Sequence, residues 1–141
     1  MHAITIQILS WKEAEAELKY IRTQVFMLEQ GVSADLEWDG LDQDAIHLLL
    51  RNEKNQAIGC ARILNHDHIG RMAVLKQWRH QGCGKALMKA AIAHCCEQQT
   101  KVIHLSAQVD AINFYQKLGF EICSNVYMDA NIPHQDMRFI C

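Results

Sequence analysis

Apolar and polar residues alternate at the start of the chain and then take up helical spacing. Residues 3–9, AITIQIL, alternate and are rich in β-branched side chains, which predicts a strand. Ser10 and Glu13 fit a capping box, so a helix is predicted from there until Gly31 ends it. A turn-rich segment, 32–44, separates this helix from the next apolar run.

The remaining pattern predicts strands and helices in turn. Apolar runs at 45–51 and 57–64 flank a turn and indicate an antiparallel hairpin, and a further strand is predicted at 69–75. Helical spacing returns after Gly82 and fades near residues 97–101. The pattern then predicts a strand, a short helix and two final strands, at 102–108, 110–119, 120–128 and 134–140.

This order, β-α-β-β-β-α-β-α-β-β, is typical of a mixed α/β domain with one sheet. The 141 residues suit a single domain spanning 1–141, which would bury about two-thirds of its unfolded surface. Half of the residues are hydrophobic and 21% are charged, which is a globular composition. No apolar run is long enough to cross a membrane.

Charge is distributed unevenly, although the net charge is only −2. Of 16 acidic residues, six lie between Arg22 and Arg51, where no Lys or Arg occurs. The rest of the chain has ten acidic and 14 basic residues. The six are Glu29, Asp35, Glu37, Asp39, Asp42 and Asp44. This acidic segment either attracts cations or is a solvated loop, and both interpretations remain open.

Six cysteines could form three disulfides, but no apolar leader-like stretch precedes them in MHAITIQILS. Reduced thiols and a cytoplasmic location are therefore expected. The chain has no C-x-x-C pair, and His66 and His68 flank Asp67 in a predicted turn without further ligands. No metal site is predicted.

The stretch WRHQGCGKALM, residues 78–88, places two glycines at the entrance to a predicted helix. A nucleotide P-loop would need glycine at Arg79 and a hydroxyl residue at Ala86, and a dinucleotide fingerprint would need glycine at Leu87. What remains is anion binding by the amides of residues 81–86, with charge added by Arg79 and Lys85. The alternative is that the glycines only permit a tight turn.

Two motifs resemble one known family. The Arg-x-x-Gly-x-Gly segment after GRMAVL resembles the acetyl-CoA signature of the GNAT superfamily of N-acetyltransferases, and AINFYQKLGFE resembles its second signature. The segments VFMLEQGV, EWDGLDQDAIHL, HLSAQ and ANIPHQDM resemble a subgroup of small bacterial GNAT proteins. The similarity spans about residues 20–139. Asn131 stands where that subgroup usually has glycine, a substitution that asparagine tolerates well.

The resemblance implies a single mixed, mostly antiparallel sheet flanked by helices, in which the strands at 69–75 and 102–108 splay apart. Acetyl-CoA would be the co-substrate, without a metal. Main-chain groups of residues 72–74 would pair with the pantetheine arm, and amides of residues 81–86 would hold the pyrophosphate. The implied cofactor groove comprises Met72, Ala73, Val74, Arg79, His80, Gln81, Gly82, Cys83, Gly84, Lys85, Ala86, Gln108 and Phe114.

Acetyl transfer to an amine requires that the amine lose a proton and that the departing thiolate be stabilised. The family's tyrosine falls on Tyr115, whose hydroxyl is protonated at pH 7 and can donate a hydrogen bond to sulfur. Candidates for the general base are Glu29, Glu37, Asp39 and His47, directly or through water. His134 either lines the acceptor pocket or anchors its loop.

The leading interpretation is a cytoplasmic N-acetyltransferase that transfers an acetyl group directly, in a ternary complex, to a small-molecule or peptide amine. The alternative is an acyl-CoA-binding module without catalysis. Nucleic acid is disfavoured because no aromatic platform is interleaved with the basic residues, and no membrane partner is expected. A homodimer is compatible with the resemblance.

Overall fold

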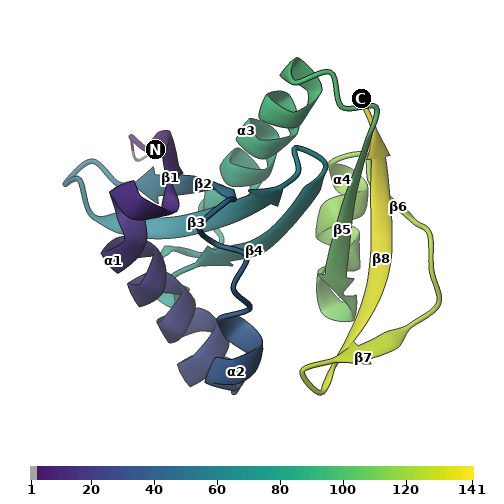
Figure 1. The fold of residues 1–141 in the computed structure, drawn as a ribbon, viewed down its shortest axis with the longest axis horizontal. Helices are drawn as coiled ribbons and strands as arrows, with labels where there is room; N and C mark the ends of the chain where they lie inside the picture. The colour runs from purple at the N-terminus through teal and green to yellow at the C-terminus, as the bar shows by residue number, and fades with distance from the viewer. Residues whose placement is uncertain (1–2) are drawn as a thin grey trace.

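The computed structural model describes residues 3–141, which fold around one eight-stranded sheet (Figure 1). The strand order is β1-β2-β3-β4-β5-β8-β6, with β7 also paired to β8. The strands are β1 (Thr5–Ser10), β2 (Ile46–Arg51), β3 (Ala57–Leu64), β4 (His68–Val74), β5 (Val102–Gln108), β6 (Glu121–Ile122), β7 (Tyr127–Asp129) and β8 (Ile132–Ile140). The helices are α1 (Trp11–Arg22), η1 (Thr23–Glu29), α2 (Ala34–Glu37), η2 (Lys76–Trp78), α3 (Cys83–Glu97), η3 (Val109–Ala111) and α4 (Ile112–Lys117).

The β4–β5 pair is parallel and divides the sheet into two halves. All other strand pairs are antiparallel, and β4 and β5 share only the pairing of His68 with His104. Beyond that point the two strands diverge into a V, as Figure 1 shows. The predicted fold class, with its splayed strand pair, is confirmed.

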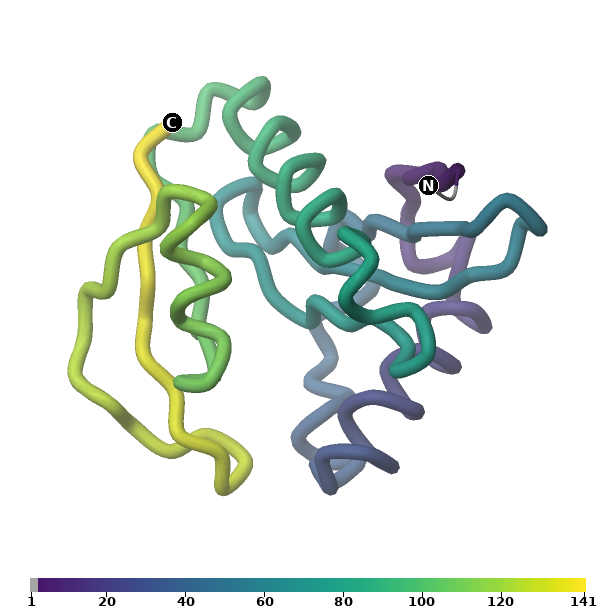
Figure 2. Tube along the Cα trace, turned by 180° about the vertical axis from the view of Figure 1, so that it is seen from behind, coloured from purple at the N-terminus to yellow at the C-terminus, as the bar shows by residue number. Residues whose placement is uncertain are grey.

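Helices cover both faces of the sheet. Figures 1 and 2 show α1 on one face of the first half and α3 on the other, with α4 on the α3 side of the second half. The strands of the first half are therefore buried from both sides: Leu48, Leu49 and Leu50 of β2 are all fully buried. This accounts for the continuous apolar run in the sequence, where a one-sided strand would alternate.

The predicted long helix begins as expected but changes its winding. Ser10 and Glu13 form the capping box, and α1 ends at Arg22. The next seven residues, η1, form a π-helix, in which the Gln30 N–H donates to the Val25 carbonyl five residues earlier at 3.1 Å. Gly31, with φ of 74°, then ends the helical region. The wider winding turns this end of the helix toward the divergent strands, where Val25 and Phe26 line a cavity.

Two predicted elements differ in detail. The segment 32–44 contains a short helix, α2, instead of turns alone. The predicted strand 120–128 is divided into β6 and β7, because residues 123–126 leave the pairing pattern. These four residues face only two residues of β8, and the Ser124 hydroxyl accepts the Asp136 N–H of β8 at 2.8 Å.

The expectation of six reduced thiols is wrong for one pair. Cys96, near the end of α3, forms a disulfide with Cys141 after β8, with the two Cα atoms 5.5 Å apart. Sequence spacing could not indicate this pairing, because the fold brings together residues 45 positions apart. The other four cysteines are free thiols.

Candidate active site

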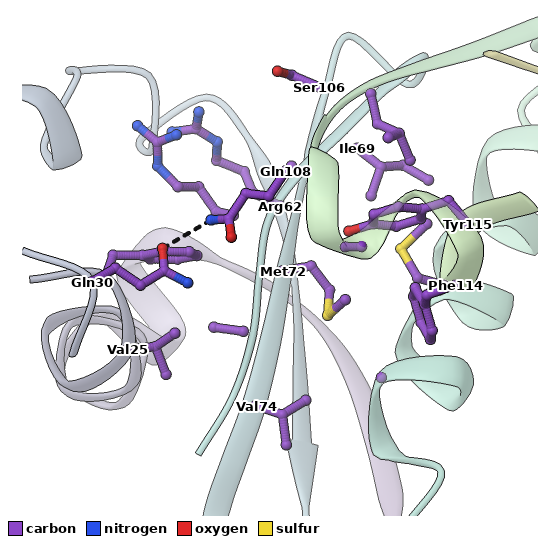
Figure 3. Close-up of a pocket in the computed structure, with 18 of the residues that line it drawn as sticks. Val25, Gln30, Arg62, Ile69, Met72, Val74, Ser106, Gln108, Phe114 and Tyr115 are labelled. Atoms are coloured by element: carbon purple, nitrogen blue, oxygen red, sulfur yellow. Dashed lines mark hydrogen bonds between the residues drawn. The ribbon is translucent and has the colours of Figure 1, made fainter. Parts of the chain in front are cut away.

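A cavity of about 880 Å³ occupies the gap between β4 and β5 (Figure 3). It reaches from the N-terminus of α3 to the segment around α2, so it opens on both faces of the sheet. Tyr115 and Phe114 project from α4 toward Met72 of β4. On the other side, the Gln108 amide of β5 donates to Gln30 of the η1 region at 2.9 Å. The cavity is therefore a passage between the two half sheets.

A bulge in β4 creates the passage. The register with β3 shifts because the strand carries one extra residue between Gly70 and Ala73, and Arg71 adopts a left-handed φ of 47°. Ala73 and Val74 still pair with β3, but their other edge faces the gap, since the structure pairs β4 with β5 only at His68. Open main-chain groups on a strand edge can bind an extended ligand in the manner of an added strand.

The loop before α3 directs main-chain amides into the same cavity. Gly82 has φ of 85°, and the first helical hydrogen bond joins the Ala86 N–H to the Gly82 carbonyl at 3.0 Å. The amides of residues 83–85 precede that bond and so have no helical acceptor. An added Cβ at Gly84 would meet Phe114 at 3.5 Å, an ordinary van der Waals contact, so packing alone does not require glycine there. This end of α3 can therefore hold an anion.

Arg79 belongs to this loop but is already engaged. Its guanidinium donates two hydrogen bonds to Glu29, both at 2.6 Å, and a third to the Val74 carbonyl at 2.9 Å. Hydrogen bonds from Arg79 also lower the pKa of Glu29. The pair ties the acidic segment to the glycine loop. Glu29 is not among the residues that line the cavity.

Tyr115 lies in an aromatic environment next to the cavity. Its ring packs edge-on against Phe114 and Phe120, with centroids 5.0 and 6.1 Å away. Burial raises the pKa of Tyr115 to about 12. The hydroxyl is therefore fully protonated at neutral pH and acts as an uncharged hydrogen-bond donor.

Two acidic residues of the 32–44 segment are paired with a buried arginine. Arg22 donates to Glu37 at 2.7 Å and to Asp42 at 2.6 Å, and all three side chains are almost completely buried. Trp38 and Trp11 cover the guanidinium, with ring centroids 4.9 and 5.7 Å away. Burial raises the pKa of Glu37 against the opposing pull of Arg71 and Arg22. Glu37 lines the cavity.

Asp39 is paired in the same cluster, with arginines of β3 and β4. Arg62 donates to both of its carboxylate oxygens at 2.9 Å, and Arg71 to one of them at 3.2 Å. Burial would raise the pKa of Asp39, but the hydrogen bonds from Arg62 and the Leu41 amide outweigh it and lower the value to about 2. Four of the six acidic residues of the segment, Glu29, Glu37, Asp39 and Asp42, are thus paired with arginines from α1, β3, β4 and the glycine loop.

The lowered pKa of Asp39 predicts a pH-dependent contribution to stability. Such a carboxyl stabilises the fold above its unfolded pKa, about 3.9, and loses that contribution as pH falls through the folded value. Asp39→Asn should lower the free energy of unfolding by roughly 2 kcal/mol at pH 7, and the difference should shrink between pH 4 and pH 2. Urea unfolding across this pH range measures it. Asp44→Asn, at an exposed carboxylate, is the control, and a constant difference for Asp39→Asn would contradict the prediction.

His47 lies apart from the passage. It is fully buried, packs against Trp11 with centroids 5.4 Å apart, and its Nε2 lies 2.9 Å from the Asp42 carbonyl. Burial lowers the pKa of His47. His47 is not among the residues that line the cavity, so it is not placed to take a proton from a substrate there. Its contact with the Asp42 carbonyl instead holds the acidic segment in place.

The structure brings most of the predicted groove together. All the predicted groove residues line the cavity except Gln81 and Ala86, and Tyr115 and Glu37 line it as well, whereas Glu29 and His47 do not. Sequence reasoning did not single out Arg62, Gln30 or Ser106, which also line it. Arg62 carried a signal, since it is a charged residue inside the apolar run AIGCARIL.

Comparison with known proteins agrees with this geometry. The GNAT acetyltransferase domain family matches residues 12–141. The chain is 34% identical over 130 residues to an uncharacterized N-acetyltransferase, YjcF, of Bacillus subtilis, covering 87% of this chain and 92% of that protein. It superimposes on Escherichia coli ElaA with a TM-score of 0.85 at 30% identity, covering 96% and 99% of the chains. For an acyl-CoA N-acyltransferase of Pseudomonas aeruginosa the TM-score is 0.82 at 31% identity, with 99% of each chain covered.

The chain therefore belongs to the GNAT acetyltransferase family. It is an N-acetyltransferase, a class of enzyme that uses acyl-CoA as co-substrate and amines as acceptors. Within residues 3–141 no helix is long and apolar enough to span a membrane. The described side chains also include no group of three or more histidine, cysteine or acidic residues that could hold a metal ion.

Proposed function

We propose that the protein transfers the acetyl group of acetyl-CoA directly to a primary amine while both substrates are bound. The observation that carries the proposal is the passage itself, which joins an anion-binding helix end on one face to Tyr115 and the acidic segment. A molecule with a diphosphate at one end and a thioester at the other matches this layout. We also propose a cytoplasmic location, since four of the six cysteines are free thiols.

Residues at each end of the passage support acetyl-CoA as the acetyl donor. The amides before α3, together with Lys85 and His80, would hold the diphosphate, and the open edge of β4 at residues 72–74 would pair with the pantetheine arm. Bound acetyl-CoA supplies an activated acyl group. Tyr115 would then donate a hydrogen bond to the sulfur atom as the thiolate forms.

Direct transfer is favoured over an acetylated cysteine. Among the described residues, Cys83 is the cysteine that lines the cavity, and it is buried at the start of α3. Burial raises the pKa of the Cys83 thiol, so little thiolate is present at neutral pH. The amine itself is therefore the nucleophile in the proposed reaction.

The acceptor side of the passage is partly apolar. Phe26, Val32, Leu36 and Leu64 line it, and its carboxylate Glu37 is paired with arginines, as is Asp39 outside the lining. This composition supports an amine attached to an apolar or neutral group better than a polyamine, whose several charges would need free carboxylates. The acceptor test should therefore include 2-phenylethylamine beside spermidine, glucosamine, amino acids and peptides.

Release of free CoA thiol in the presence of acetyl-CoA and this amine panel tests the proposed function. We expect amine-dependent thiol release together with a product heavier than the amine by one acetyl group. Tight binding of acetyl-CoA without release for any amine would instead identify a CoA-binding module without catalysis.

Gly82→Ala tests the anion site independently of turnover. A methyl group here lies where the amides face the diphosphate, and we expect CoA affinity to fall at least tenfold in calorimetry. The backbone strain of alanine at φ of 85° adds about 1 kcal/mol of instability.

Gly40→Ala is the matched control for this strain. Gly40 has φ of 80°, an added Cβ would meet nothing within 4 Å at either glycine, and Gly40 lies outside the cavity lining. It should lose similar stability and keep full CoA affinity. Equal affinities for the two variants would place the diphosphate elsewhere.

A further inference from the structure

We propose that His134 is the general base that takes the proton from the acceptor ammonium. This inference rests on the proposed function and adds the proton acceptor that the acidic segment was expected to supply. Five observations carry it: the hydrogen bond of one ring nitrogen, the packing of the ring, its place beside the gap, the ligation of the competing groups, and the proton balance of the reaction.

One hydrogen bond assigns the protonated nitrogen of His134. Its Nδ1 lies 2.6 Å from the Ile132 carbonyl oxygen. A carbonyl oxygen only accepts hydrogen bonds, so Nδ1 carries the hydrogen, and in the neutral ring Nε2 keeps its lone pair. Nε2 is therefore the nitrogen that can accept a proton, which is the arrangement that general bases of this type require.

The ring of His134 is held in place by its neighbours. It stacks on Tyr127 with an interplanar angle of 20° and centroids 6.1 Å apart. Tyr127 is fixed in turn, because its hydroxyl donates to Asp136 and also hydrogen-bonds Ser106. His134 is only 9% exposed, yet it lines the cavity. Its orientation is thus set before any acceptor binds.

The register of the sheet puts His134 beside the reacting part of the gap. His134 pairs with Gln108, at the open end of β5. The bulge adds one residue to β4, so Gln108, four positions beyond His104, lies level with Ala73 across the gap. Ala73 belongs to the edge, residues 72–74, that is proposed to hold the pantetheine arm. His134 therefore flanks the acceptor face at the level where the thioester would emerge.

The other candidate bases are less suited. Glu37 faces the cavity, but its Oε2 is shared by Arg22 at 2.7 Å and Arg71 at 3.3 Å, so protonation would leave buried cations unpaired. Glu29 is bound by Arg79. His68 lines the cavity at its closed end, where β4 and β5 still pair. His134 alone among these combines an acceptor nitrogen with a place at the open end.

The proton balance of the reaction is complete with His134 and the thiolate. An ammonium acceptor loses two protons as it becomes an amide. The first passes to Nε2 of His134 and on to solvent, which frees the nitrogen lone pair. The amine nitrogen then bonds to the acetyl carbon, the carbon–sulfur bond breaks, and the second proton ends on the CoA sulfur. An acceptor that is already neutral needs only the second transfer.

Two isosteric acceptors separate a base from a binding or structural residue. 2-Phenylethylamine is an ammonium ion at pH 7, whereas O-benzylhydroxylamine has nearly the same shape and is neutral. His134→Asn keeps a side-chain amide that can donate to the Ile132 carbonyl but removes Nε2. We expect this variant to lose about tenfold in kcat with 2-phenylethylamine and to stay within twofold of wild type with O-benzylhydroxylamine. His66→Asn, at an exposed position outside the cavity lining, should leave both rates unchanged.

Each outcome decides a different claim. An unchanged rate for His134→Asn with 2-phenylethylamine overturns the base, and an equal loss with both acceptors reduces His134 to a binding or structural residue. Absence of transfer by the wild-type enzyme with every amine would instead overturn the proposed function.

A separate readout is the long-range ¹H–¹⁵N spectrum of the free protein. The His134 signals, identified by their loss in the variant, should show hydrogen on Nδ1, and hydrogen on Nε2 would contradict the inference.

Discussion

Replacing Tyr115 by phenylalanine is expected to lower kcat for acetyl transfer by at least tenfold while leaving the affinity for acetyl-CoA within twofold of wild type. The change removes one hydroxyl and keeps the ring that packs on Phe114 and Phe120. Removing one hydrogen-bond donor to a developing negative charge typically lowers kcat by about 10²–10³-fold, so a loss of at least tenfold is expected. Steady-state thiol release and calorimetric titration measure the two quantities.

The raised pKa of Tyr115 decides which role the hydroxyl plays. Proton transfer from a group with a pKa of about 12 to a thiolate near 8.5 would be uphill by roughly 5 kcal/mol. A hydrogen bond that strengthens as charge builds on sulfur carries no such cost. Tyr20→Phe, at an exposed position of α1, is the control and should change nothing. A Tyr115→Phe enzyme with unchanged kcat would remove the tyrosine from the mechanism.

Replacing Arg22 by methionine is expected to lower the free energy of unfolding by about 3–5 kcal/mol. Arg22 is the nearest cation to Glu37 and Asp42, which are 2% and 4% exposed. Its loss leaves these buried carboxylates with only longer contacts, from Arg71 to Glu37 at 3.3 Å and from Arg62 to Asp42 at 3.2 Å. Whole domains of this kind have only about 5–15 kcal/mol of stability, so the variant should unfold at much lower urea concentration. Equilibrium unfolding by circular dichroism measures the effect.

A matched surface variant and a compensated variant test the physical cause. Lys19→Met breaks the exposed ion pair with Glu15 and should change stability by less than about 0.5 kcal/mol. Adding Glu37→Gln and Asp42→Asn to Arg22→Met removes the unpaired charges and should recover part of the loss. A loss below 1 kcal/mol for Arg22→Met would mean that the cluster relaxes or hydrates at little cost.

Local sequence rules were sufficient for much of this fold. The capping box of Ser10 and Glu13 begins α1, and the glycine pair begins α3, because these contacts join residues a few positions apart. Apolar runs located the strands of the first half for the same reason. The π-helical segment after Arg22 was not predicted, because seven residues are too few for apolar spacing to distinguish π from α winding.

The ion-pair partners of the acidic segment could not be predicted from the sequence. Its charge bias was visible, but its partners were not: Arg22–Glu37, Arg62–Asp39 and Arg79–Glu29 join residues 15, 23 and 50 positions apart. Those pairs neutralise most of the acidic residues of the segment, while Asp35 and Asp44 stay exposed. His134 was ambiguous for a similar reason, because its neighbour Tyr127 and its partner strand are set by the pairing of β5, β7 and β8.

The divergent strands also make the sheet a hinge. Its two halves share a single β4–β5 residue pair, and the disulfide between Cys96 and Cys141 ties α3 to the end of β8. Widening the far end of the V would break no hydrogen bond between β4 and β5, because none is formed there. The width of the gap is therefore set by side-chain contacts, such as the Gln108–Gln30 hydrogen bond and the one hydrophobic core that spans both halves, and not by strand pairing.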